Sequence, residues 1–83
     1  MGVVKVQVTV LPKTGILDPQ GKAIAGALSR LGWRGVSEVR AGKVFRVEVE
    51  ASGPDEALAA GARMAEKLLA NPVIEEFEVE VLG

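Results

Sequence analysis

The chain has 83 residues, of which 10 are basic and 11 are acidic, and it contains neither cysteine nor histidine. It therefore lacks disulfides, thiolate metal sites, thiol nucleophiles and the most common general base, so we expect no metal site and no catalysis by this chain alone. The formal net charge of -1 argues against nucleic acid and against an anionic membrane as partners.

A chain of this length is expected to form a single domain, residues 1–83, because it shows no linker, repeat or low-complexity segment. No apolar run approaches the ~20 residues of a membrane span, and the amino terminus does not resemble a secretion signal, so we expect a cytoplasmic protein. Domains of this size bury only about 60 to 65% of the surface of the unfolded chain. Self-association is therefore the default expectation.

The first predicted element is a half-buried strand, in which valines at positions 4, 6, 8 and 10 alternate with polar residues until Pro12. A helix is predicted next, from Asp18 to Leu31, and Gly32 is its predicted C-cap. Its apolar positions recur at helical spacing. These positions are Ile24, Ala27, Leu28 and Leu31.

The start of this helix, "LDPQGK", contains one unexpected residue. Asp18 and Pro19 are a strong cap and first helical residue, but Gly21 follows in the first turn, where glycine costs about 1 kcal/mol relative to alanine. Either Gly21 is tolerated slack, or something must approach the backbone there. In the second case Gln20 and Lys22 would offer hydrogen bonds and charge to a partner. Alanine in place of Gly21 is expected to stabilise the free chain by a few tenths of a kcal/mol.

The middle of the chain reads as a β-hairpin, "VSEVR" and "KVFRVEVEA" joined through Ala41 and Gly42. A bulge with positive φ at Gly42 would bring Val39 to the face that carries Phe45. A hairpin tip by itself also explains the polar residues around Gly42.

The second half of the chain is predicted to form a helix and a strand. "SGPDE" offers Ser52 as the capping residue, and "ANP" ends the helix, because Asn71 can adopt the left-handed conformation and Pro72 cannot continue a helix. The last strand places its apolar residues on one face. These are Val73, Phe77, Val79 and Val81.

The element order βαββαβ predicts an α+β, ferredoxin-like fold with a four-stranded antiparallel sheet and two helices on one face. The opposite face would be rich in charge, and either it is solvated or it docks onto another chain. It would carry Lys5, Gln7, Thr9, Val44, Arg46, Glu48, Glu50, Ile74, Glu76, Glu78 and Glu80. Trp33 is expected to cover the core or, if exposed, to anchor an interface. The residues alone indicate a soluble interaction module.

Three stretches resemble the PurS family, the small subunit of phosphoribosylformylglycinamidine (FGAM) synthase. They are "KVQVTVLPKTGILDPQGKAI", "ALSRLGWRGVSEVRAGKVFRVEVE" and "KLLANPVIEEFEVE". The resemblance implies a non-catalytic subunit in purine biosynthesis that binds no cofactor itself and supports assembly and ammonia transfer. The implied partners are a glutaminase subunit and a large synthetase subunit that uses ATP and magnesium. It also implies a homodimer, which can pair further into a dimer of dimers.

The resemblance also marks the residues expected to bind partners. These are Asp18, Pro19, Gln20, Gly21, Lys22, Arg40, Gly42, Lys43, Asn71 and Pro72. Glu75 belongs to the same motif as Asn71 and Pro72, which could equally serve geometry alone. Arg46 stands where relatives tend to have an acid, so the partner contacts of the sheet face are left unassigned. The alternative function is a small-molecule sensor resembling the ACT-type regulatory domains, which share this topology.

Overall fold

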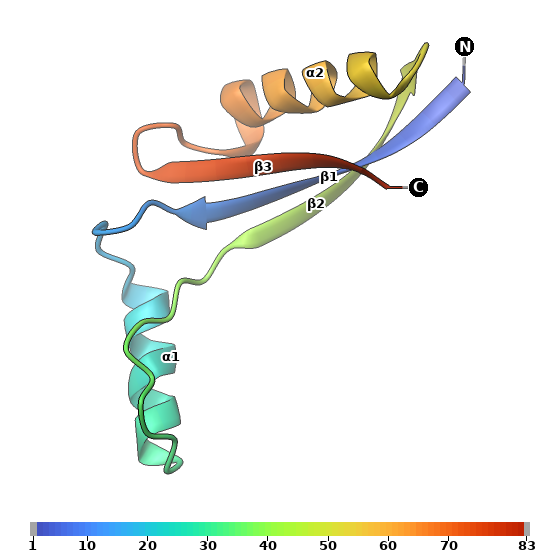
Figure 1. Cartoon of the computed structure of the whole chain (residues 1–83). Coiled ribbons are helices and arrows are strands. Elements are labelled where there is room, and N and C mark those ends of the chain that lie inside the picture. Colours follow the sequence, from blue (N-terminus) through green and yellow to red (C-terminus); the bar gives the residue numbers. More distant parts are fainter. Residues whose placement is uncertain (1, 83) are drawn as a thin grey trace.

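The computed structural model describes residues 2–82, which form a flat body and a projecting arm (Figure 1). The elements follow one another along the chain as two helices, one π-helical turn and three strands. They are β1 (Gly2–Pro12), α1 (Pro19–Arg30), β2 (Lys43–Ala51), α2 (Pro54–Met64), η1 (Ala65–Leu69) and β3 (Glu75–Leu82). None of the helices in this part of the chain is long and apolar enough to cross a bilayer.

The three strands form one antiparallel sheet in the order β2-β1-β3, and α2 lies across one face of it (Figure 1). The register places Val8 of β1 between Phe45 of β2 and Val79 of β3. Alternate residues of each strand therefore face α2, which confirms the apolar face predicted from the alternation.

The core lies between this face and α2. Val6, Val8 and Val10 are fully buried, and the half-buried apolar residues of β2 and β3 pack around them. Gly61 of α2 allows the helix to come close to the sheet, because a Cβ there would lie 2.7 Å from Cγ1 of Val79. Burial of these three valines stabilises the body by about 1.5 to 3 kcal/mol each.

The face of the sheet opposite α2, here called the open face, is uncovered by the rest of residues 2–82 (Figure 1). At its centre Gln7 donates to Glu80 Oε1 at 3.0 Å and accepts from Arg46 Nε at 3.1 Å. The open face carries two basic residues and five glutamates. They are Lys5, Arg46, Glu48, Glu50, Glu76, Glu78 and Glu80.

The arm consists of α1 and residues 31–39, which run back beside the helix (Figure 1). The strands, α2 and η1 pack extensively on one another, but α1 is not among them. The Cα radius of gyration is 16.0 Å, and the molecule measures 52 × 26 × 14 Å. A compact domain of this length has a radius of gyration of about 12 Å. The arm therefore projects from the body and does not cover the sheet.

This architecture corrects the predicted ferredoxin-like sheet of four strands with two helices on one face. The sheet has three strands, and within residues 2–82 α2 and its continuation η1 form the one helical segment lying on it. Residues 36–40 form no strand, and Val39 and Arg40 instead lie at the base of the arm, described below. The prediction of a bulge with positive φ at Gly42 is also wrong, since the positive-φ glycines of the described chain are Gly15, Gly32 and Gly35.

The ends of α1 agree with the sequence. Asp18 is the N-cap, and Gly32 has φ of +98° just beyond the last turn. The N–H groups of Gly32 and Trp33 donate to the carbonyl oxygens of Ser29 and Leu28, at 3.1 and 3.0 Å. This hydrogen-bond pair is the Schellman motif, which closes a helix with glycine.

The ends of α2 differ from the prediction. Gly53 is the N-cap, and Ser52 instead donates its hydroxyl to the Glu56 carboxylate. Asn71 does not adopt the left-handed conformation. α2 continues into η1, where the Ala70 N–H donates to the Ala65 carbonyl oxygen at 2.9 Å. Val73 precedes β3 and is exposed, so its predicted place in the strand is wrong.

Candidate functional site

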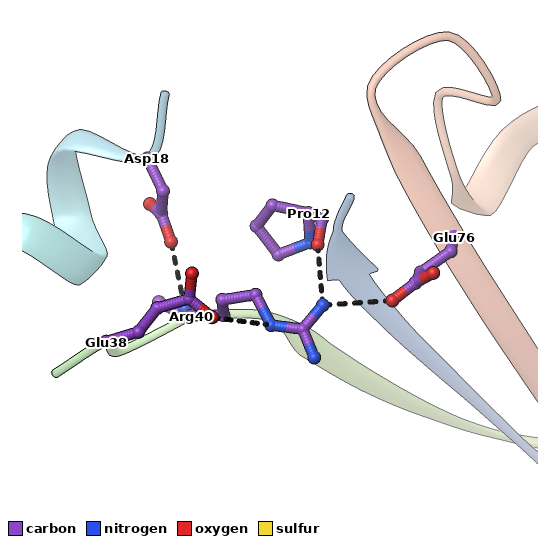
Figure 2. Close-up of polar contacts among 6 residues, drawn as sticks. Pro12, Asp18, Glu38, Arg40 and Glu76 are labelled. Carbon is purple, nitrogen blue, oxygen red and sulfur yellow. Dashed lines mark hydrogen bonds and ion pairs between the residues drawn. The ribbon is translucent and has the colours of Figure 1, made fainter. Parts of the chain in front are cut away.

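The arm meets the body at a cluster of polar contacts, here called the junction. It joins the end of β1, the start of α1, residues 39–42 and the start of β3 (Figure 2). The junction contains four of the ten residues expected to bind partners. They are Asp18, Gly21, Arg40 and Gly42.

Asp18 connects the two chain segments that lead into and out of the arm. Its Oδ1 accepts from the Gly21 N–H at 3.0 Å, and its Oδ2 accepts from the Ala41 N–H at 3.0 Å. These backbone hydrogen bonds, first from Gly21 and then from Ala41, lower the pKa of the Asp18 carboxyl from its ordinary value. One carboxylate thus caps α1 and also ties the helix to the returning segment.

Arg40 connects the returning segment to the body. Its Nη1 donates to the Pro12 carbonyl oxygen at 3.1 Å and to Glu76 Oε1 at 2.9 Å (Figure 2). Its Nε lies 3.8 Å from Glu38 Oε1 on the arm. A single guanidinium therefore contacts the end of β1, the start of β3 and the arm itself.

Two glycines allow close backbone approach at the same place. A Cβ on Gly21 would overlap the Val39 carbonyl oxygen, and a Cβ on Gly42 would overlap the Val10 carbonyl oxygen. Gly21 is therefore not slack, and what approaches it is the chain's own returning segment. The expectation that alanine at Gly21 stabilises the chain is wrong for this reason.

Asn71 and Pro72 lie in the loop before β3, next to the junction. Asn71 Oδ1 accepts from the Val73 N–H at 3.1 Å, and the Asn71 N–H donates to Glu75 Oε1 at 2.7 Å. Lys13 Nζ donates to the Pro72 carbonyl oxygen at 2.8 Å. These bonds shape the loop and fasten it to the segment that follows β1.

The remaining four marked residues, Pro19, Gln20, Lys22 and Lys43, are exposed around the junction. Two hollows of about 220 and 230 Å³ lie here, the first lined in part by Lys22 and the second by Gln20 and Lys43. Ligand pockets usually measure about 300 to 1,000 Å³. The small hollows and exposed side chains fit a contact surface, and partner binding by these residues stays a prediction.

The arm presents apolar side chains that the rest of the described chain leaves exposed. Leu31 is 77% exposed and Trp33 is 64% exposed at the tip of the arm, and Leu17, just before α1, is 69% exposed. Trp33 is thus the exposed tryptophan that the sequence reading linked to an interface anchor.

Three groups at the junction were not identified from the sequence. They are the Pro12 carbonyl oxygen, the Ala41 N–H and the Glu76 carboxylate. Backbone groups leave no signal in a sequence, and Glu76 was assigned to the open face. The opposite charges of Arg40 and Glu76 are compatible with a contact, but the sequence predicts that contact only once the strand order is known.

Within residues 2–82 no group of three or more Asp, Glu, His or Cys side chains could hold a metal ion, and no polar or charged residue is buried. The polar residues of the junction instead fix one part of the chain against another. This arrangement suits a binding or assembly role.

Comparison with known proteins gives a consistent result. Residues 5–83 match the family model PurS, described as phosphoribosylformylglycinamidine (FGAM) synthase. The chain is 51% identical over 72 residues to the FGAM synthase subunit PurS of Mycobacterium leprae, covering 87% of each chain. It is 41% identical to PurS of Bacillus subtilis, with a TM-score of 0.81 and coverage of 96% of this chain and 99% of that chain. A chain in the structure of PurLQS from Thermotoga maritima is 35% identical, with a TM-score of 0.87 and coverage of 99% and 100%. The chain therefore belongs to the PurS family.

Proposed function

We propose that this chain is the non-catalytic PurS subunit of FGAM synthase in purine biosynthesis and that it supports assembly and ammonia transfer. The observation that carries the proposal is the match to PurS over residues 5–83, and the projecting arm gives the chain a surface for contact. In this role ATP and magnesium are used by the synthetase subunit, and this chain binds neither.

The proposed partners are the synthetase and glutaminase subunits. Support comes from the similarity to a chain of the Thermotoga maritima PurLQS structure, which spans 99% of this chain. The ACT-like sensor is not favoured, because the family model and the curated relatives are all PurS.

We also propose a homodimer, which can pair further, in which the arm of one copy contacts the open face of the other. The arm carries Lys22, Arg30 and Arg34 against one acid, Glu38, whereas the open face carries five glutamates against two basic residues. Opposite charges favour this contact over a contact between like surfaces. The exposed apolar residues of the arm would be buried in such a dimer.

Reconstitution tests the proposed function. The chain is added to the cognate synthetase and glutaminase, and turnover is measured with glutamine and separately with ammonia. We expect glutamine-dependent turnover to require the chain, while ammonia-dependent turnover by the synthetase changes little. Full glutamine-dependent turnover without the chain would contradict the proposal.

The dimer has its own test, sedimentation of the chain with the double substitution Arg30→Glu and Arg34→Glu. We expect the variant to dissociate at concentrations where the original chain is dimeric, because two attractive charges become repulsive. Arg63→Glu on α2, outside the arm and the open face, is the matched control. An unchanged dimer in the double variant would exclude this contact.

A further inference from the structure

The angle between arm and body is set by few groups. The elements of the body pack on one another through an apolar core, whereas α1 has no extensive contact with any of them. An element without such packing is held by its ends alone. The orientation of the arm therefore depends on the contacts of the junction.

Within the junction, the contacts have different roles. Asp18 ties the start of α1 to Ala41, which links the two segments that enter and leave the arm. Arg40 reaches past these segments and contacts the body at Pro12 of β1 and Glu76 of β3 (Figure 2). Because Pro12 and Glu76 lie on neighbouring strands, the guanidinium resists rotation of the arm about the two segments that enter and leave it.

We infer that Arg40 is a positioning residue that holds the arm at a fixed angle to the sheet, so that the arm meets its partner chain already oriented. This inference rests on the proposed function, in which the arm contacts the open face of a second copy and the dimer activates the synthetase and glutaminase.

The consequence for binding follows from populations. If the arm samples many angles, the fraction of molecules ready to bind falls, and the apparent dissociation constant rises by the inverse of that fraction. Nη1 of Arg40 carries two N–H groups in the rigid guanidinium plane, one for each acceptor, whereas the lysine ammonium is a point charge on a flexible stem. The side chain of Arg40 is 31% exposed and that of Glu76 is 54% exposed, so their loss leaves the body folded.

The test compares Arg40→Ala, Arg40→Lys and Glu76→Gln with a control, Arg63→Ala, which removes an exposed arginine of α2 far from the junction in the sequence. Spin labels on Ser29→Cys in the arm and Ala59→Cys in α2 report the spread of arm positions. Each variant is also titrated into the synthetase and glutaminase to obtain the half-activating concentration and the plateau of glutamine-dependent turnover.

We expect Arg40→Ala to broaden the label distance distribution and to raise the half-activating concentration about fivefold to tenfold, with the plateau unchanged. Lysine should restore part of both effects, Glu76→Gln should show a smaller effect of the same sign, and Arg63→Ala should show none. An Arg40→Ala distribution as narrow as that of the original chain would overturn the inference. A reduced plateau at an unchanged half-activating concentration would also overturn it, since Arg40 would then act inside the formed complex.

The two readouts separate this inference from the proposed function. The distance measurement needs no partner subunit, so it tests the positioning role of Arg40 even if the original chain fails to activate the synthetase and glutaminase. That failure would count against the proposed function alone.

Discussion

The body and the arm of this chain contain amphipathic helices of similar length, but only one of the two helices is covered by its own sheet. α2 lies on the valines of β1, which are fully buried, whereas Leu31 at the end of α1 is 77% exposed (Figure 1). The body is held by apolar burial, and the arm is held by hydrogen bonds and one ion-paired arginine at its base. The apolar stripe of a helix thus shows that a face is to be buried, without showing which chain buries it.

The largest expected effect separates the two regions directly. Val8→Ala removes buried methyl groups from the centre of the body and should lower the free energy of unfolding by about 2 to 3 kcal/mol. Leu31→Ala on the arm should lower it by less than about 0.5 kcal/mol, because that side chain is exposed. Urea unfolding at a fixed, low protein concentration measures both. Equal losses would contradict the division into body and arm.

The next largest effect on the free energy of unfolding is expected from alanine substitutions at two glycines of α1. Gly21→Ala should lower the free energy of unfolding by about 1 to 3 kcal/mol, because the new Cβ overlaps the Val39 carbonyl oxygen. Gly26→Ala is the matched control, since its Cβ meets only Arg30 Nη1 at 3.6 Å and helix propensity should then add about 1 kcal/mol. Thermal unfolding of the two variants should therefore shift in opposite directions. A stabilised Gly21→Ala variant would show that Val39 does not approach Gly21.

A smaller effect is expected on the open face. Gln7→Ala removes the link between Arg46 and Glu80 and should cost about 0.5 to 1 kcal/mol, because each hydrogen bond is exposed to water. Thr9→Ala, on the same strand and face, is a control without this link. If both variants unfold at the same urea concentration, the Gln7 link contributes nothing measurable.

The smallest effect is the response of the junction to acid. The pKa of Asp18 is lowered in the folded chain, so its contribution is complete above the ordinary value of 3.8 and is lost as the pH falls through the lower, folded pKa. We expect the arm distance distribution to stay narrow from pH 7 to pH 4 and to broaden below that. Asp18→Asn should reduce this pH dependence. Glu56→Gln controls for the second carboxyl with a lowered pKa, which is bonded to Ser52 on the body.

Strands and helices with local signals were predicted well from the sequence. The alternating valines of β1, the Asp18 cap and the Gly32 terminus each depend on neighbouring residues, and the structure contains all three. The position of α1 depends instead on contacts between Asp18 and Ala41 and between Arg40 and Pro12, which join distant parts of the chain through backbone groups.

Partner binding by the candidate site stays a prediction, and its geometry was not foreseen. Asp18, Gly21, Arg40 and Gly42 were marked as partner-binding, and the structure brings all four to one junction. Their internal contacts could not be foreseen, because the sequence favoured a hairpin that would have folded residues 36–40 onto the sheet.

The proposed assembly and the role of Arg40 both require that the arm projects from the body. Because the chain contains no native cysteine, Ser29→Cys and Ala59→Cys can be spin-labelled uniquely and diluted with an excess of unlabelled chain, so that only distances within one molecule are measured. The account predicts one narrow population far above the roughly 10 Å that separates the axes of two packed helices. A population near that spacing would place α1 beside α2 on the sheet and would contradict the account.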